Sequence, residues 1–242
     1  MSFLNDTLTD TNGVLLENHT GETGATWTRH PSYIGTSPVI ASNRLRETDA
    51  ANASALYSSG VPSSAEYTII WTVRRVAGSV QSFSSVCGRM STTADTFYNV
   101  QYRHDVQEWR MFQNVANSFT LLGSFAQALT IGQDYACRFE ITNATKKFLV
   151  DSVERISSAD NTITDAGRVG VRMIGSSIDA EGYHYDSLAT IGVDPVVVTS
   201  QIQIPAAQVT VPIVRGAVMD TPWIREQQTT VPFVRGVQVG DY

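Results

Sequence analysis

Residues 67–75 read Tyr-Thr-Ile-Ile-Trp-Thr-Val-Arg-Arg, a run dominated by β-branched and aromatic side chains. Such side chains favour the pleated, half-buried surface of a β-strand. The run is followed by Ala77-Gly78-Ser79, a sequence typical of a turn. We therefore predict a strand over 67–75.

Runs of the same kind recur along the chain. They cover residues 80–87, 97–103, 108–113, 119–125, 135–142, 147–150, 168–173 and 183–191. In the run 97–103, the side chains of Tyr98, Val100 and Tyr102 alternate with those of the intervening residues. Short strands separated by turns about every eight to twelve residues predict an all-β, antiparallel sandwich or jelly roll. One local alternative is a helical turn over Ala50–Ser58.

The order of these segments resembles the concanavalin A-like (laminin G-like) lectin and glucanase domains, which also occur in bacteriophage structural proteins. The resemblance begins with the segment from Asp6 to Thr28 and with Asn43-Arg-Leu-Arg46, and it extends to about residue 193. Gly167-Arg-Val-Gly-Val171 is similar to the Gly-x-Val-Gly-hydrophobic strand of that family. The resemblance implies a jelly-roll sandwich over residues 1–194. It implies little about function, because the same fold includes lectins, glycosidases and structural modules without a ligand.

Composition excludes several function classes. The formal net charge is −6, so the basic footprint of a nucleic-acid-binding protein is missing. No apolar run approaches the roughly 20 residues of a membrane-spanning helix, and residues 1–10 show no signal-peptide pattern. We therefore expect no nucleic acid and no membrane as partners. We expect Cys87 and Cys137 to be buried, reduced thiols.

Candidate catalytic and metal-binding residues are few. Glycosidases with this fold carry paired carboxylates in a Glu-x-Asp-x-(x)-Glu pattern, and this sequence has none. The four histidines lack metal-ligand spacing. We expect no enzymatic activity, no metal and no cofactor. One alternative is calcium held by loop carboxylates, for which Asp6, Asp10 and Asp186 are the candidates. Another is a lectin site, for which the available aromatic residues are Trp27, Tyr33, Tyr57, Tyr98, Tyr102 and Trp109.

The composition changes after Asp194, and five of the eight prolines lie at or beyond Pro195. A ten-residue unit repeats three times, with Thr or Asp two residues before proline and a large apolar residue directly after it. An arginine follows three residues after each proline. The repeated positions are Pro212, Ile213, Arg215, Pro222, Trp223, Arg225, Pro232, Phe233 and Arg235.

Proline excludes helices and central strands, so we expect residues 195–242 to form an extended arm of short β segments. An arm this apolar is a poor solvated linker, and we expect it to bind a partner or neighbouring copies of the chain by strand addition. A jelly roll with such an arm resembles auxiliary structural proteins of bacteriophage virions. The first hypothesis is a capsid decoration protein that is assembled in the host cytoplasm. It would contact other virion proteins as a homo-oligomer, with a trimer expected. The alternative is a carbohydrate-binding adhesin of a phage tail or cell surface, with a glycan as its partner.

Overall fold

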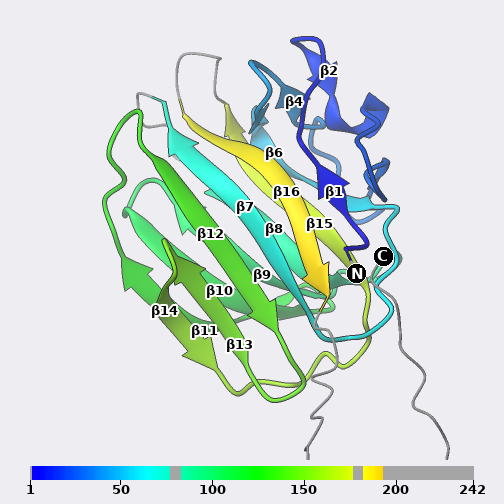
Figure 1. Cartoon of the computed structure of the whole chain (residues 1–242), viewed down its shortest axis with the longest axis vertical. Coiled ribbons are helices and arrows are strands. Elements are labelled where there is room, and N and C mark those ends of the chain that lie inside the picture. Colours follow the sequence, from blue (N-terminus) through cyan, green and yellow to red (C-terminus); the bar gives the residue numbers. More distant parts are fainter. Residues whose placement is uncertain (1, 77–82, 177–181, 193–242) are drawn as a thin grey trace, which may run out of the picture. The chain divides into compact units, whose positions relative to one another are not determined.

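The computed structural model describes residues 2–76, 83–176 and 182–192. Over these residues the chain forms two antiparallel β-sheets that face each other as a sandwich (Figure 1). The arm, its repeated residues and the boundary at Asp194 all lie outside the described residues. The division into residues 1–194 and 195–242 therefore stays a prediction.

The nine-stranded sheet contains most of the short N-terminal strands. Its order is β14 (Val153–Ser158), β13 (Lys146–Val150), β12 (Asp134–Ile141), β7 (Tyr67–Arg75), β16 (Tyr183–Gly192), β5 (Leu45–Arg46), β4 (Val39–Ile40) and β2 (Val14–Leu15). Strand β1 (Asn5–Asp6) pairs with β16 outside this path. A 3₁₀ turn, η1 (Leu16–Asn18), follows β2.

The seven-stranded sheet contains a continuous meander, in which β8, β9, β10 and β11 are neighbours both in sequence and in space. Its full order is β11 (Ser118–Ala126), β10 (Glu108–Val115), β9 (Phe97–Arg103), β8 (Phe83–Met90), β15 (Arg168–Ser176), β6 (Thr48–Ser58) and β3 (Trp27–Arg29). Strands β6 and β15 come from distant parts of the sequence. The sheet therefore joins local hairpins to long-range pairs, as a jelly roll requires.

The core lies between the two sheets and follows from strand alternation. Side chains two residues apart point to the same face of a sheet. In β7 these are Tyr67, Ile69, Trp71 and Val73, and in β9 they are Tyr98, Val100 and Tyr102; all of them are buried in one hydrophobic cluster. Consequently Phe97, Asn99, Gln101 and Arg103 of β9 lie on the outer face of the seven-stranded sheet.

Most expected strands are confirmed. The predicted strands 67–75 and 97–103 coincide with β7 and β9, and the others agree within a few residues wherever the structure describes them. The helical alternative for Ala50–Ser58 is wrong, because these residues belong to β6, which pairs with β15 on one side and β3 on the other. Pairing on both edges overrides the local preference of an alanine-rich sequence.

Strand β14 was not expected from the sequence. Of its six residues only Ile156 is buried, because β14 is the last strand of the nine-stranded sheet. An edge strand with one buried side chain has no apolar alternation to detect.

Both cysteines are free and buried, as expected. Burial raises the pKa of the Cys87 thiol to about 12 and also raises the pKa of Cys137. In the described part of the chain, no helix has both the length and the apolar character needed to cross a membrane.

Candidate functional site

The outer face of the seven-stranded sheet carries an aromatic group built from distant segments. Five rings contribute to it, and we call them, together with Arg172, the aromatic platform. The rings belong to Tyr33 before β4, Phe83 of β8, Phe97 of β9, Phe112 of β10 and Phe119 of β11. Among the residues that the structure describes, Phe119 is the one aromatic side chain with high exposure, at 38%.

Arg172 of β15 lies at the centre of the platform. Its guanidinium carbon is 4.6 Å from the ring centre of Phe83, 5.1 Å from that of Phe119 and 5.2 Å from that of Tyr33. A guanidinium at such distances is attracted to the aromatic rings. The three rings therefore fix the guanidinium in one place on the face.

A short hydrogen-bonded chain anchors one side of the platform. Arg172 Nε donates to Tyr33 Oη at 3.1 Å, and Tyr33 Oη donates to Asp95 Oδ1 at 2.7 Å. Asn114 Nδ2 donates to the same carboxylate oxygen at 2.9 Å. Burial raises the pKa of the Tyr33 hydroxyl, so the phenol stays protonated and can donate. The chain orients both Tyr33 and Asp95.

Asn99 occupies the middle of this face and is fully buried. In the register of the sheet it lies between Cys87 of β8 and Phe112 of β10. Neither Nδ2 nor Oδ1 of its side chain has a hydrogen-bond partner among the described residues. An unsatisfied buried amide costs about 1–3 kcal/mol, and because Asn99 is fully buried its side chain does not reach a ligand on the surface.

The other arginines on this outer face are neutralised by neighbours. Arg103 Nε donates to Asp105 at 2.9 Å, and Arg110 Nε donates to Glu108 at 2.7 Å. The hydrogen bond from Arg103 lowers the pKa of the Asp105 carboxyl group. Hydrogen bonds from Ser124 and then from Arg110 lower the pKa of the Glu108 carboxyl group. The structure therefore pairs both Asp105 and Glu108 with arginine.

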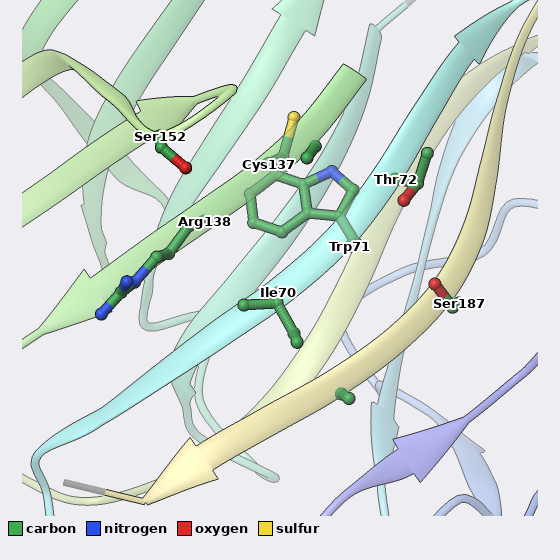
Figure 2. Close-up of a pocket in the computed structure, with 9 residues that line it drawn as sticks. Ile70, Trp71, Thr72, Cys137, Arg138, Ser152 and Ser187 are labelled. Atoms are coloured by element: carbon green, nitrogen blue, oxygen red, sulfur yellow. The ribbon is translucent and has the colours of Figure 1, made fainter. Parts of the chain in front are cut away.

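A separate hollow of about 290 Å³ lies on the nine-stranded sheet, at strands β7, β12 and β16 (Figure 2). Small side chains at Ala136, Ser187 and Ala189 leave room beside Ile70, and most of the lining is apolar. Its lining residues are Ile70, Trp71, Thr72, Ala136, Cys137, Arg138, Ser152, Ser187 and Ala189. Trp71 lines the hollow but is 97% buried in the core, so the hollow offers no exposed aromatic ring.

A second hollow, of about 260 Å³, lies beside Arg89, Asp165 and Arg168. Arg89 is buried, and all three of its guanidinium nitrogens donate to neutral oxygens, including Ala65 O at 2.9 Å and Asn143 Oδ1 at 2.9 Å. Arg168 donates to Ser59 O at 2.6 Å. These arginines hold loops together, and this hollow has no aromatic lining.

The residues considered for calcium form a different arrangement. Asp6 is buried and accepts hydrogen bonds from Trp27 Nε1 at 2.7 Å and from the Leu8 backbone at 2.7 Å. His19 lies within 3.0 Å of Asp6 and 2.8 Å of Asp10, whereas Asp186 lies 3.5 Å from Arg44. The described residues contain no group of three or more His, Cys, Asp or Glu side chains placed to hold a metal ion.

The structure divides the six aromatic residues considered for a lectin site. Trp27, Tyr98, Tyr102 and Trp109 are buried in the core, so they cannot contact a ligand on the surface. Tyr33 belongs to the platform, and Tyr57 packs against the small cluster of Ala55, Cys87, Met90 and Phe97. Sequence reasoning missed Phe119, Asp95 and Arg172. For Phe119 and Arg172 the one available signal is the alternation of side chains within the predicted strands 119–125 and 168–173. For Asp95 the sequence offers no signal.

Known proteins resemble this chain in fold, but none was matched by sequence. No protein-family model matches this sequence, and no curated protein matches it either. The carbohydrate recognition domain of Emp46p, in its metal-free form, has a TM-score of 0.54 and 13% identity, over 76% of this chain and 97% of that one.

Two further solved structures have a similar fold. The carbohydrate-binding module CBM66 from Bacillus subtilis has a TM-score of 0.50 and 14% identity, over 66% of this chain and 91% of that one. The exoplasmic/lumenal domain of VIP36, in its Ca²⁺-bound form, has a TM-score of 0.50 and 10% identity, over 76% of this chain and 90% of that one. The chain therefore has the concanavalin A-like jelly-roll fold that the order of its strands predicts.

Proposed function

We propose that the sandwich is a carbohydrate-binding module and that the glycan contacts the aromatic platform. The observation that carries this proposal is the exposed ring of Phe119 beside the guanidinium of Arg172. Protein sites for small polar ligands combine an apolar surface with a few fixed polar groups. On the platform the ring of Phe119 is the surface on which a sugar would stack, and Arg172, Tyr33 and Asp95 supply the polar groups.

The fold comparisons support this proposal without extending to a specific sugar. Two of the similar structures are named as carbohydrate-binding or carbohydrate-recognition domains. Identities of 13–14% carry the fold alone, so the assignment to this chain rests on the platform. Neither hollow competes with the platform as a sugar site, because neither is lined by an exposed aromatic ring.

We propose binding without catalysis. Glycoside hydrolysis generally needs two carboxyl groups flanking one bond. On the platform Asp95 is the carboxylate, and it accepts hydrogen bonds from Tyr33 and Asn114. The nearest acids along β9 and β10, Asp105 and Glu108, are held by arginines. Such pairing favours an ionised carboxylate and disfavours a general acid.

The test is retention of the full chain on a glycan array, with Phe119→Ala as the site variant. Val153→Ala is the matched control, because Val153 is 50% exposed on β14 of the other sheet. We expect the wild-type chain and Val153→Ala to retain the same glycans, and Phe119→Ala to lose affinity by about twofold to tenfold, since stacking on an aromatic ring contributes roughly 0.5–1.5 kcal/mol. Equal retention by Phe119→Ala, or no glycan retained by the wild-type chain, would contradict the proposal.

Capsid decoration and virion location stay predictions, since both rest on the arm. A chain ending at Asp194 separates this hypothesis from the adhesin reading. If the shortened chain loses particle attachment and the sandwich binds no glycan, decoration is favoured. If the shortened chain keeps glycan binding and loses only self-association, the adhesin reading is favoured.

A further inference from the structure

Arg172 has unused hydrogen-bonding capacity that the buried Arg89 lacks. Its Nε donates to Tyr33 Oη. Among the described residues, neither of its terminal guanidinium nitrogens has a hydrogen-bond or ion-pair partner, and neither is a buried unsatisfied atom. The terminal nitrogens are therefore open to solvent and to a ligand.

Arg89 provides the comparison within the same molecule. Its Nε, Nη1 and Nη2 all donate to backbone or amide oxygens, so its guanidinium is fully occupied by the fold. Arg103 and Arg110, on the same face as Arg172, each have a carboxylate partner. Arg172 thus differs from its neighbours in having a fixed guanidinium and no anion.

The aromatic rings around Arg172 preorganise its guanidinium for binding a ligand. Contacts with Phe83, Phe119 and Tyr33 hold the guanidinium within 5.2 Å of three ring centres. A ligand that binds there does not have to immobilise a free arginine side chain, which would otherwise cost affinity. The rings also remove water from the faces of the guanidinium, which strengthens a charge-assisted hydrogen bond.

The geometry of the Arg172 guanidinium favours a ligand that carries a carboxylate. A guanidinium presents parallel N–H groups in one plane, and this fork matches the two oxygens of a carboxylate. Asp95 does not fill this position: it accepts from Tyr33 and Asn114, and it makes no ion pair with Arg172.

We propose that the platform takes an acidic saccharide, and that Arg172 binds the carboxylate of a uronic or sialic acid residue while Phe119 stacks on a sugar ring. This inference rests on the proposed function, since it names the class of glycan for the same site. It goes further by assigning to Arg172 the selectivity for charged over neutral sugars.

The test uses the full chain and pairs of oligosaccharides on one array. Each uronic-acid or sialic-acid oligosaccharide is printed beside its carboxyl-reduced counterpart, which has the same rings and linkages without the charge. We expect the wild-type chain to prefer the carboxylated member by about tenfold or more, as a hydrogen bond to a charged group predicts. This comparison needs no variant, so it does not depend on how a substitution folds.

Variants then assign the preference to a residue. Arg172→Gln should abolish it, and Arg172→Met, which keeps an unbranched chain between the rings, should do the same. Arg110→Gln is the matched control, because it removes one positive charge from the same face and should leave the preference intact.

The outcomes separate the two claims. Retention of neutral glycans with no gain from the carboxylate would overturn the acidic class and leave glycan binding standing. Preference for sulfated over carboxylated rings, or a carboxylate preference that survives Arg172→Gln and Arg172→Met, would also overturn it. Retention of no glycan at all would overturn the proposed function itself.

Discussion

His19 lies between two carboxylates and uses both of its ring nitrogens. Nδ1 is 2.8 Å from Asp10 and Nε2 is 3.0 Å from Asp6. Burial lowers the pKa of the imidazole, but the hydrogen bonds with Asp10 and Asp6 outweigh burial and raise the pKa above 6.5. The protonated ring therefore joins β1, the loop before β2 and the end of η1.

The sign of the pH dependence follows from this raised pKa. A group whose pKa is higher in the folded than in the unfolded chain stabilises the fold fully below the unfolded value. This contribution is lost as the pH rises from 6.5 through the folded pKa of His19. We expect the free energy of unfolding, measured in urea between about pH 6 and about pH 9, to fall more steeply for the wild-type chain than for His19→Gln.

Asp10→Asn provides the control for this cluster, because it removes the carboxylate whose hydrogen bond raises the pKa of His19 most. The fall in stability should then occur at lower pH than in the wild-type chain. Identical pH profiles for the wild-type chain and His19→Gln would show that the imidazole does not carry the dependence.

At the scale of elements, Gly167-Arg-Val-Gly170 shows why a sequence pattern accompanies this fold. Gly167 has a φ of +55°, and a Cβ there would overlap the backbone of Arg89 at the end of β8. A Cβ at Gly170 would overlap Met90 and lie 2.7 Å from Leu56 O of β6. The glycines permit β15 to enter between β6 and β8.

We expect Gly167→Ala to destabilise the fold by about 3 kcal/mol or more, because left-handed strain and overlap with the Arg89 backbone add together. The control is Gly13→Ala, where φ is +91° and no atom lies within 4 Å of the added carbon. It should cost about 1 kcal/mol, from strain alone. Chemical denaturation of the two variants measures the difference; equal losses would mean that the close approach of β8 and β15 is unimportant.

The elements also show what the sequence could predict. Strands such as β7 and β9 are visible because one face of each is apolar and buried, which produces period-two alternation. Strand β6 was open to a helical reading, since its alanines and serines become a strand only through pairing with β15 and β3. Strand β14 carries one buried side chain and leaves no pattern.

The platform could be predicted only in part, for a related reason. Alternation places Asn99, Gln101 and Arg103 on one face of β9, but it does not say which face of which sheet meets a ligand. Arg172 and Phe119 lie far apart in sequence, on β15 and β11, and tertiary structure alone brings them within 5.1 Å. Tyr33 was a candidate because it is aromatic, whereas its hydrogen bond with Asp95 depends on folding.

At the scale of the whole sandwich, the two sheets have different outer faces. The seven-stranded sheet carries the exposed ring of Phe119 and the fixed guanidinium of Arg172. The nine-stranded sheet carries a hollow with a mainly apolar lining of small side chains. The role of the repeated arm over residues 195–242 in assembly remains a prediction.

The central claim is that a glycan binds to the seven-stranded sheet. The most direct measurement is a titration of the isotope-labelled full chain with a retained oligosaccharide, followed by backbone amide chemical shifts. We predict that the shifts concentrate at Tyr33, Phe83, Phe119 and Arg172. Shifts concentrated instead at Ile70, Ala136 and Ala189 would place the ligand in the hollow of the nine-stranded sheet and contradict the account.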